Sequence, residues 1–336
     1  MAHSNSSLNL FTACQRKYWH QHINHTTPCK PPSPHLTFGA IAHEVLEKAG
    51  NLRDNADYIS ADEYVQCIPS ELLHEDLKKH FNIKSWHSYF APIISQVEKY
   101  EKKLADEILA TDGGYTIKRE IKLSMNDSQL RDCGLLEDGK ELKMPLVGVI
   151  DLLLLGTTHA TIIDYKFSTS QKTQDNFDMD SQLYIYALFV SYTFDIPLHN
   201  IKIGYIDIPK EEFAQPIVLT NGTLSRAKSQ NVSAEMYLEA IKRQHPDTWQ
   251  DMIQPGGYYY DILLELTFKK CAYLNSQYLD LQAYAAIIAD VIDTAVMIDL
   301  INTNKYPYLA RYDAYTCKSC EYIKACKHWL GVNDND

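Results

Sequence analysis

The chain has 336 residues, of which 45% are hydrophobic and 22% charged, and this composition excludes a disordered, collagen-like or low-complexity protein. At about 150 residues per domain, the length predicts one or two domains with a sizeable buried core. The 32 Lys and Arg residues against 43 Asp and Glu residues give a net charge of −11. This balance argues against a surface that grips nucleic acid non-specifically, although a local basic groove is compatible with it.

Helices are expected on both sides of a proline-rich loop at 28–34. One helix should begin at 39–48, and predominantly polar helical sequence runs from 61 to about 111. After Gly113 and Gly114 the apolar period changes from 3.6 to 2, which indicates a switch from helix to strand. The patterns that follow predict strands at 115–123, 146–155, 160–167 and 201–208, a helix at 181–194, a turn-rich segment at 209–260 and a long helix at 273–302.

No segment is expected to cross a membrane. The longest apolar stretch, 281–301, contains Asp290, Asp293 and Asp299, and each would cost about 2.5–3.5 kcal/mol at the bilayer centre. We therefore predict a buried helix there. Residues 1–10 lack a basic segment followed by an apolar core, so no secretory signal is expected and a cytoplasmic location is predicted.

In a reducing compartment the eight cysteines are expected to be free thiols. Three of them form the pattern Cys317-x2-Cys320-x5-Cys326, which is typical of a metal site, and either Cys14 or His328 could supply a fourth ligand. Structural zinc and an iron–sulfur cluster both accept four thiolates, so the spacing leaves both open. The other four cysteines are isolated, and we expect ordinary buried or half-exposed thiols.

Two acids interrupt apolar strands, Asp151 in 146–155 and Asp164 in 160–167. A carboxylate in a buried strand is costly unless it is paired or binds a metal. Their oxygens suit Mg²⁺ or Mn²⁺, and Lys166, two residues after Asp164 and so on the same strand face, could orient water and stabilise a phosphate. A buried Asp–Lys ion pair accounts for the spacing equally well.

Other polar residues carry weaker signals. A lone histidine on a helix, such as His43, is more often a packing residue than a ligand. Gln182 and Tyr186 are four residues apart, so they share a helix face that could reach DNA, but an ordinary amphipathic face is the preferred interpretation. Glu120 could assist a metal site, but its interpretation as a solvated strand residue is preferred.

Taken in chain order, these residues resemble the PD-(D/E)XK nuclease superfamily. The order is Cys14, His43, Gly148-Val149-Ile150-Asp151, Asp164-Tyr165-Lys166, Gln182-x3-Tyr186 and Cys317-x2-Cys320-x5-Cys326. It is similar in particular to the iron–sulfur branch with RecB-like and AddB-type domains, CRISPR-adaptation nucleases and phage exonucleases. The resemblance spans residues 14 to 326. It departs from many relatives in having Asp164 rather than Glu before the lysine.

The resemblance implies a role for each matching residue. The catalytic cation, Mg²⁺ or Mn²⁺, would be bound by His43, Asp151, Asp164 and the backbone carbonyl of Tyr165, with Asp151, Asp164 and Lys166 forming the catalytic set. Gln182 and Tyr186 would help to position DNA. Cys14, Cys317, Cys320 and Cys326 would hold a structural 4Fe-4S cluster that joins the chain ends, with zinc as the alternative.

The implied fold is α/β, a restriction-endonuclease-like central mixed sheet flanked by helices, with a helical insertion and a C-terminal iron–sulfur cluster region. Within one integrated nuclease domain we expect an N-terminal helical segment at 1–43, the helical insertion at 44–112, the sheet core at 113–208, an insertion or lobe at 209–260, and C-terminal helices with the cysteine cluster at 261–336.

The implied function is metal-dependent hydrolysis of DNA phosphodiesters by in-line attack of water. A single-strand exonuclease in recombination, repair or phage DNA processing is expected, acting on DNA that is single-stranded or has free ends. A helicase or recombination protein is a candidate partner, because this chain contains no Walker-type motif. The alternative is a non-catalytic DNA-binding or assembly subunit with a structural iron–sulfur cluster.

Overall fold

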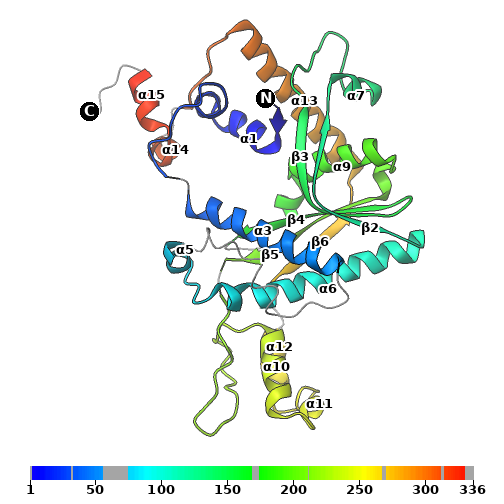
Figure 1. The fold of residues 1–336 in the computed structure, drawn as a ribbon, viewed down its shortest axis with the longest axis vertical. Helices are drawn as coiled ribbons and strands as arrows, with labels where there is room; N and C mark the ends of the chain where they lie inside the picture. The colour runs from blue at the N-terminus through cyan, green and yellow to red at the C-terminus, as the bar shows by residue number, and fades with distance from the viewer. Residues whose placement is uncertain are drawn as a thin grey trace.

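The computed structural model describes residues 2–31, 33–55, 75–168, 174–210, 212–266, 270–311 and 314–329. A mixed sheet lies at the centre of this part of the chain, with helices on both faces (Figure 1). The expected α/β class with a central mixed sheet flanked by helices is confirmed. The start of the helical sequence predicted from residue 61 falls outside the described residues.

The strands are β1 (His3–Ser4), β2 (Thr116–Met125), β3 (Leu146–Leu155), β4 (Ala160–Ser168), β5 (Ile201–Pro209) and β6 (Tyr273–Tyr278). The longer helices are α1 (Asn5–Ala13), α3 (Pro34–Asp54), α6 (Trp86–Asp112), α9 (Ser181–Phe194), α10 (Ala234–Gln244) and α13 (Leu281–Asn304). The shorter helices are α2 (Gln15–Tyr18), η1 (Trp19–Ile23), α5 (Glu75–His80), α7 (Asp127–Asp132), α8 (Gln174–Asp178), η3 (Leu198–Asn200), α11 (Trp249–Met252), α12 (Tyr260–Leu266), α14 (Ala314–Ser319) and α15 (Ile323–Trp329).

The strands follow the order β1-β3-β4-β5-β6, and β2 also pairs with β3. The β4–β5 and β1–β3 pairs are parallel, whereas β2–β3, β3–β4 and β5–β6 are antiparallel. All four predicted strands and the helix at 181–194 are confirmed within two residues. The helix predicted over 273–302 is wrong at its start, because β6 pairs with the exposed edge of β5 before Asp280 caps α13.

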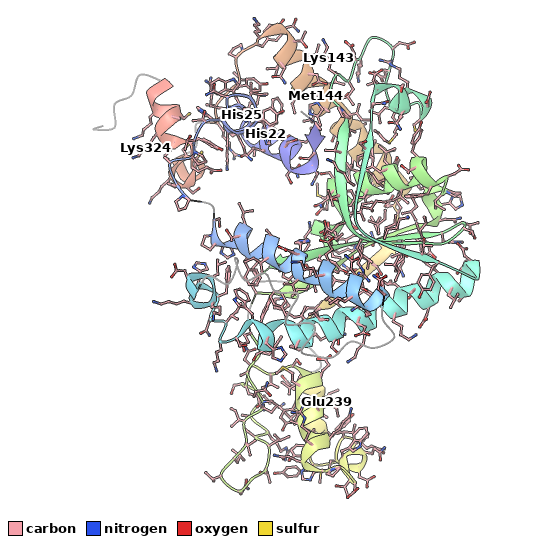
Figure 2. All side chains as sticks on the ribbon, viewed as in Figure 1. His22, His25, Lys143, Met144, Glu239 and Lys324 are labelled. Atoms are coloured by element: carbon pink, nitrogen blue, oxygen red, sulfur yellow. The ribbon has the colours of Figure 1, made fainter. Side chains whose placement is uncertain are left out.

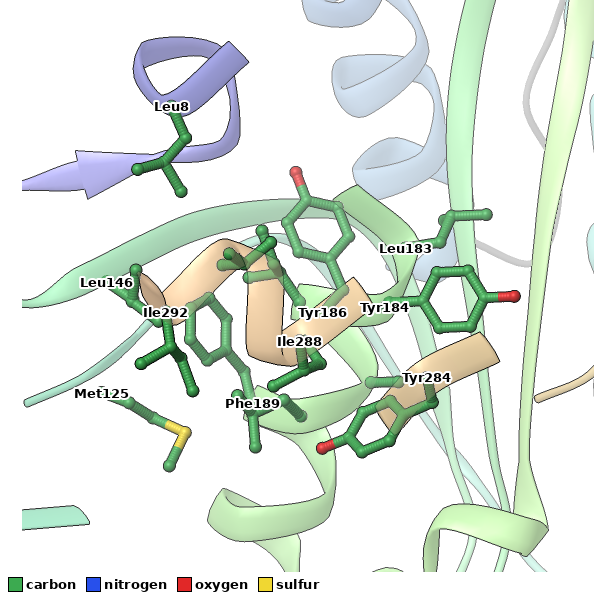
Figure 3. Close-up of a cluster of buried hydrophobic side chains, with 14 of the residues drawn as sticks. Leu8, Met125, Leu146, Leu183, Tyr184, Tyr186, Phe189, Tyr284, Ile288 and Ile292 are labelled. Atoms are coloured by element: carbon green, nitrogen blue, oxygen red, sulfur yellow. The ribbon is translucent and has the colours of Figure 1, made fainter. Parts of the chain in front are cut away.

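Two hydrophobic layers enclose the sheet. On one face, α3 and α6 pack against the odd-numbered positions of β4, such as Ile163. On the other face, α9 covers the even-numbered positions, such as Ile162, and α13 packs against α9. Figure 3 shows this second layer, in which Phe189 of α9 lies near Ile288 and Ile292 of α13. The sheet is therefore buried on both faces, as the continuous apolar strands predict.

The sheet forks at its centre. The β3–β4 pairing covers only the four pairs from Leu152–Ile163 to Leu155–Ala160. Beyond these pairs β3 continues with β2 and β1, while β4 continues with β5. Residues Asp151 and Asp164 come next in register, so the two strand acids lie where the strands part.

An irregularity in β2 lies beside the fork. Glu120 has φ 46°, in the left-handed region that non-glycine residues rarely adopt. The irregularity changes the alternation of side chains, because Arg119 contacts residues on the α3–α6 face while Ile121 packs in the α9 layer. By the pairing of its neighbours, Glu120 lies across from Asp151. Glu120, Asp151 and Asp164 thus form a row across three strands.

A lobe formed by residues 212–266 projects beyond α6, away from the sheet (Figure 1). Its helices α10 and α12 pack around a small hydrophobic cluster of their own, which includes Tyr237, Tyr259 and Ile262. Figure 2 labels Glu239 on this lobe, far from the fork of the sheet.

The two ends of the chain pack together on the opposite side of the molecule from the lobe. Arg16 donates to the carbonyl of Tyr308, and the Cys29 amide donates to the carbonyl of Glu321 at 2.8 Å. Figure 2 shows Lys324 of α15 on this side, with His22 in the adjacent N-terminal segment. None of the helices among the described residues is long and apolar enough to cross a membrane.

Candidate active site

Asp151 is the centre of a polar cluster at the fork. Its side chain is 8% exposed, and Oδ2 accepts a 2.7 Å hydrogen bond from the backbone N–H of Tyr165. The same oxygen lies 3.3 Å from Nδ1 of His43, which α3 presents from the other side of the fork. The carboxylate therefore replaces the strand partner that Tyr165 loses where β3 and β4 separate.

Glu120 completes a set of potential metal ligands. One donor atom from each of His43, Glu120 and Asp151 lies within 4.8 Å of the other two, and among the residues that the structure describes no other His, Cys, Asp or Glu trio does so. Glu120 is half-buried, and its carboxylate lies with these two side chains rather than in solvent alone. The left-handed backbone that turns it toward Asp151 has no signal in the sequence pattern.

Asp164 belongs to a second, adjoining network. Its Oδ2 lies 2.6 Å from Nζ of Lys166, without hydrogen-bond alignment, and its Oδ1 accepts a 2.8 Å hydrogen bond from Gln182. Gln182 also accepts a 2.9 Å hydrogen bond from Lys166 and donates at 2.7 Å to the hydroxyl of Tyr186. The helix face and the strand face predicted separately from the sequence thus meet at Gln182.

The clustered acids repel one another. Burial, followed by the charge of Asp151, raises the pKa of Glu120 to about 7. The same two causes raise the pKa of Asp164 to about 7, against the opposing effect of Lys166. Burial alone would lower the pKa of His43, but its hydrogen bond to Asp151 and the surrounding carboxylates raise it. A bound cation would relieve this repulsion.

Lys166 remains a cation in this environment. Burial lowers the pKa of the ammonium group, but the charge of Asp164, 2.6 Å away, outweighs burial and raises the pKa above its usual value. The side chain can therefore donate hydrogen bonds and stabilise negative charge, and it is not poised to accept a proton.

The donor set fits a divalent cation. Carboxylate oxygens suit Mg²⁺ and Mn²⁺, and an imidazole among the ligands favours Mn²⁺ or another transition metal over Mg²⁺. His43, Glu120 and Asp151 could hold such an ion, with Asp164 at the adjoining position. The buried Oδ2 of Asp164 has no hydrogen bond but is paired with the ammonium group of Lys166, so a cation bound at this oxygen would lie next to that group.

A cleft of about 180 Å³ lies beside Gln182. Its lining includes Gln182 and Tyr186 of α9, Lys122 and Gly148 of the sheet, and the first residues of α1. Gly148 leaves room for the Tyr186 ring, because a Cβ atom at this position would lie 2.6 Å from Cε1 of that ring. The helix residues predicted to contact DNA therefore border an open space, and one of them, Gln182, also donates a hydrogen bond to Asp164.

The structure does not show the predicted cysteine cluster. Cys14, Cys317, Cys320 and Cys326 are half-buried thiols near the packed chain ends, but no three of them bring their sulfur atoms to within ligand spacing in the described part of the chain. They are near enough to influence one another: burial raises the pKa of Cys326, with smaller contributions from the other three thiols and an opposing effect of Arg16.

The remaining cysteine predictions have mixed outcomes. Cys271 is buried, as expected, whereas Cys29 and Cys133 are exposed. Cys67 and the side chain of His328 lie outside the described residues.

A forked mixed sheet with two acids and a lysine at the fork defines a class of metal-dependent hydrolases. The family model of the PD-(D/E)XK nuclease superfamily matches residues 2–327. The chain belongs to this superfamily. The expected fold and the expected superfamily are both confirmed, and the iron–sulfur branch is not shown.

Two solved structures are similar over most of the chain. A proposed exonuclease from Eubacterium rectale is 11% identical, with a TM-score of 0.46, and the match covers 96% of this chain and 87% of that one. A protein described as SSO0001 is 13% identical, with a TM-score of 0.28 and coverage of 85% and 84%. No curated protein matches the sequence.

Proposed function

We propose that the protein is a Mg²⁺- or Mn²⁺-dependent deoxyribonuclease, and that it acts as an exonuclease on single-stranded or free DNA ends. The observation that carries this proposal is the hydrogen-bonded set of Asp164, Lys166 and Gln182 directly beside the His43–Glu120–Asp151 donors. A nuclease in this superfamily needs both parts, a cation site and a cationic side chain next to it.

In the proposed mechanism the cation would be held by His43, Glu120, Asp151 and Asp164, with the backbone carbonyl of Tyr165. When bound, it would supply Lewis acidity and a water of lowered pKa as the nucleophile. The ammonium group of Lys166 would orient the attacking water and stabilise the charge that develops on the phosphate. Gln182 fixes Lys166 and Asp164 relative to each other through two hydrogen bonds.

DNA is proposed to enter by the cleft beside Gln182. Gln182 and Tyr186 border this cleft, and Lys122, which also lines it, offers a cation to a phosphate. Gln182 connects the cleft to Asp164 through a hydrogen bond. A helicase or recombination protein would be the natural source of single-stranded ends, in repair, recombination or phage DNA processing.

The test is degradation of end-labelled single-stranded DNA with Mg²⁺ or Mn²⁺. We expect cleavage by the wild type and a loss of at least about 100-fold in Lys166→Ala and Asp164→Ala, since each variant removes charge stabilisation at the reacting phosphate. Lys242→Ala is the control, because this lysine is on the lobe and pairs with Glu239. Equal activity in all variants would contradict the proposed site, and cleavage of circular DNA would contradict the exonuclease assignment.

The rival function is a DNA-binding or assembly subunit without catalysis. It predicts DNA binding by the wild type, no cleavage with either metal, and no effect of Asp164→Ala on binding. The Asp164–Lys166–Gln182 network favours the nuclease, because a binding subunit has no need for a buried carboxylate in the middle of a strand.

We further propose a 4Fe-4S cluster held by Cys14, Cys317, Cys320 and Cys326, with zinc as the alternative. The proposal is supported by the packing of the chain ends and by the mutual influence of the four thiols. Anaerobically purified protein should be brown and contain iron and sulfide, and Cys320→Ser should be colourless. Colourless wild type that contains only zinc would refute the iron assignment.

A further inference from the structure

Glu101 of α6 is a buried carboxylate outside the proposed active site. It is 4% exposed and accepts hydrogen bonds from three side chains on three different elements. Arg119 of β2 donates from both Nη atoms, at 3.0 and 2.8 Å, and the hydroxyl of Tyr165 on β4 donates at 2.7 Å. Arg53 of α3 donates to the same carboxylate. One side chain thus joins two helices to two strands on the face opposite α9.

The bond to Arg119 connects Glu101 to the metal ligand Glu120, which is the next residue in β2. The guanidinium of Arg119 is held on the α3–α6 face by Glu101 and by Asp54, whose Oδ2 lies 2.9 Å from Nε. It crosses α3 at Gly50, where a Cβ atom would lie 2.4 Å from the guanidinium. With Arg119 anchored there, the left-handed residue after it is directed toward Asp151.

The bond to Tyr165 connects Glu101 to the other half of the site. Tyr165 stands between Asp164 and Lys166, and its side chain lies on the opposite face of β4 from theirs. Its backbone N–H donates the hydrogen bond that Asp151 accepts at the fork. Because Glu101 holds the Tyr165 hydroxyl, it fixes the segment of β4 that carries Asp164 and Lys166. The same segment contains the backbone N–H that binds Asp151.

The charge balance keeps Glu101 ionised. Burial would raise the pKa of Glu101, but the hydrogen bonds and charges of Arg119 and Arg53 hold it below its usual range. A buried and fully paired carboxylate of this kind fixes geometry. Both of its oxygens are engaged by these side chains, so Glu101 is not available to bind the cation or to take part in hydrolysis itself.

We propose that Glu101 is a positioning residue for the metal centre, acting on Glu120 through Arg119 and on Asp151, Asp164 and Lys166 through Tyr165. This inference rests on the proposed function, because it names a residue that sets the ligand geometry of the same site. Hydrogen-bond partners behind metal ligands typically change metal affinity by about 10- to 100-fold when they are removed.

The test compares Mn²⁺ binding by calorimetry with the Mn²⁺ dependence of DNA cleavage. For Glu101→Gln we expect Mn²⁺ affinity to fall about tenfold and the half-saturating Mn²⁺ concentration to rise equally. Tyr165→Phe removes one hydroxyl and should produce a smaller shift in the same direction. If Glu101→Gln does not fold, Tyr165→Phe and Arg119→Lys provide the measurement. The first removes one connection, and the second replaces the two-pronged guanidinium contact with a single ammonium group.

The matched control is Asp299→Asn in α13. Asp299 is also buried, at 2% exposure, and accepts from His3 and from the amides of Lys143 and Met144, all remote from the fork. The substitution Asp299→Asn should lower the melting temperature without changing the affinity for Mn²⁺. Unchanged Mn²⁺ affinity in Glu101→Gln and Tyr165→Phe, or an equal loss in Asp299→Asn, would overturn the inference.

The two proposals fail in different ways. If the wild type binds Mn²⁺ but cleaves no DNA, the proposed nuclease function is refuted. The positioning role of Glu101 is then still decided by the calorimetric effect of Glu101→Gln. Wild type that does not bind Mn²⁺ overturns both.

Discussion

The substitution Gly148→Ala tests the packing that supports the cleft. Gly148 lies on β3 next to α9, and an added Cβ atom would be 2.6 Å from Cε1 of Tyr186 and 3.1 Å from Cε2 of Phe189. Ordinary contact between carbon atoms is about 3.5–4.0 Å, so the Tyr186 ring must move by about 1 Å. Tyr186 is 5% exposed and belongs to the same buried hydrophobic cluster as Phe189, which leaves its ring little free space.

Two opposing effects set the change in stability. Replacing glycine inside a strand reduces the entropy of the unfolded chain and stabilises the fold by about 0.5–1 kcal/mol. Overpacking a close contact costs about 1–3 kcal/mol. The second effect is larger, so we expect a net loss of about 1 kcal/mol, which corresponds to roughly 2–4 °C in melting temperature.

The effect on activity should exceed the effect on stability. Movement of Tyr186 disturbs its 2.7 Å hydrogen bond with Gln182, which also contacts Lys166 and Asp164. A displacement of about 1 Å can lower a rate by up to about 100-fold, and here we expect kcat to fall about tenfold.

The assay is steady-state cleavage of end-labelled DNA at saturating substrate, together with thermal unfolding. Gly39→Ala is the control, because no atom lies within 4 Å of a Cβ at this position of α3, and it should stabilise the helix by about 0.5–1 kcal/mol. If Gly148→Ala matches the wild type in both melting temperature and kcat, the close packing of Tyr186 on β3 is refuted.

Two further predictions concern stability. Burial would raise the pKa of Asp112, but hydrogen bonds from Thr158 and His159 outweigh burial and hold this pKa well below its usual range. The stability that the Asp112 carboxylate contributes is therefore present above a pH of about 4 and is lost as the pH falls. Asp112→Asn should cost about 2 kcal/mol at neutral pH and less at low pH, and an identical loss in urea unfolding at about pH 7 and pH 3 would contradict this. Gly204→Ala would place a Cβ atom 2.6 Å from the carbonyl of Asn275, so it should lower the urea midpoint by displacing β6, at a cost of about 1–3 kcal/mol. An unchanged midpoint would count against this close approach.

The sequence predicts the individual elements because each has a local signal. Apolar runs at 146–155 and 201–208 become central strands. The change of period after Gly113 coincides with the end of α6, which Gly113 caps in the left-handed conformation. Period also places Asp164 with Lys166, and Gln182 with Tyr186, on shared faces. These pairs are intrinsic to one strand and one helix, so no knowledge of the tertiary structure is needed to find them.

The tertiary structure alone decides which of these faces meet. β6 lacks a local strand signal and forms because the edge of β5 offers unpaired hydrogen-bonding groups. Glu120 and Glu101 lie 31 and 50 residues from Asp151 in the sequence and reach the site only through strand pairing and helix packing. A residue acquires such a role from the partners that folding brings to it, and hydrophobic periodicity contains no information about polar contacts between distant segments.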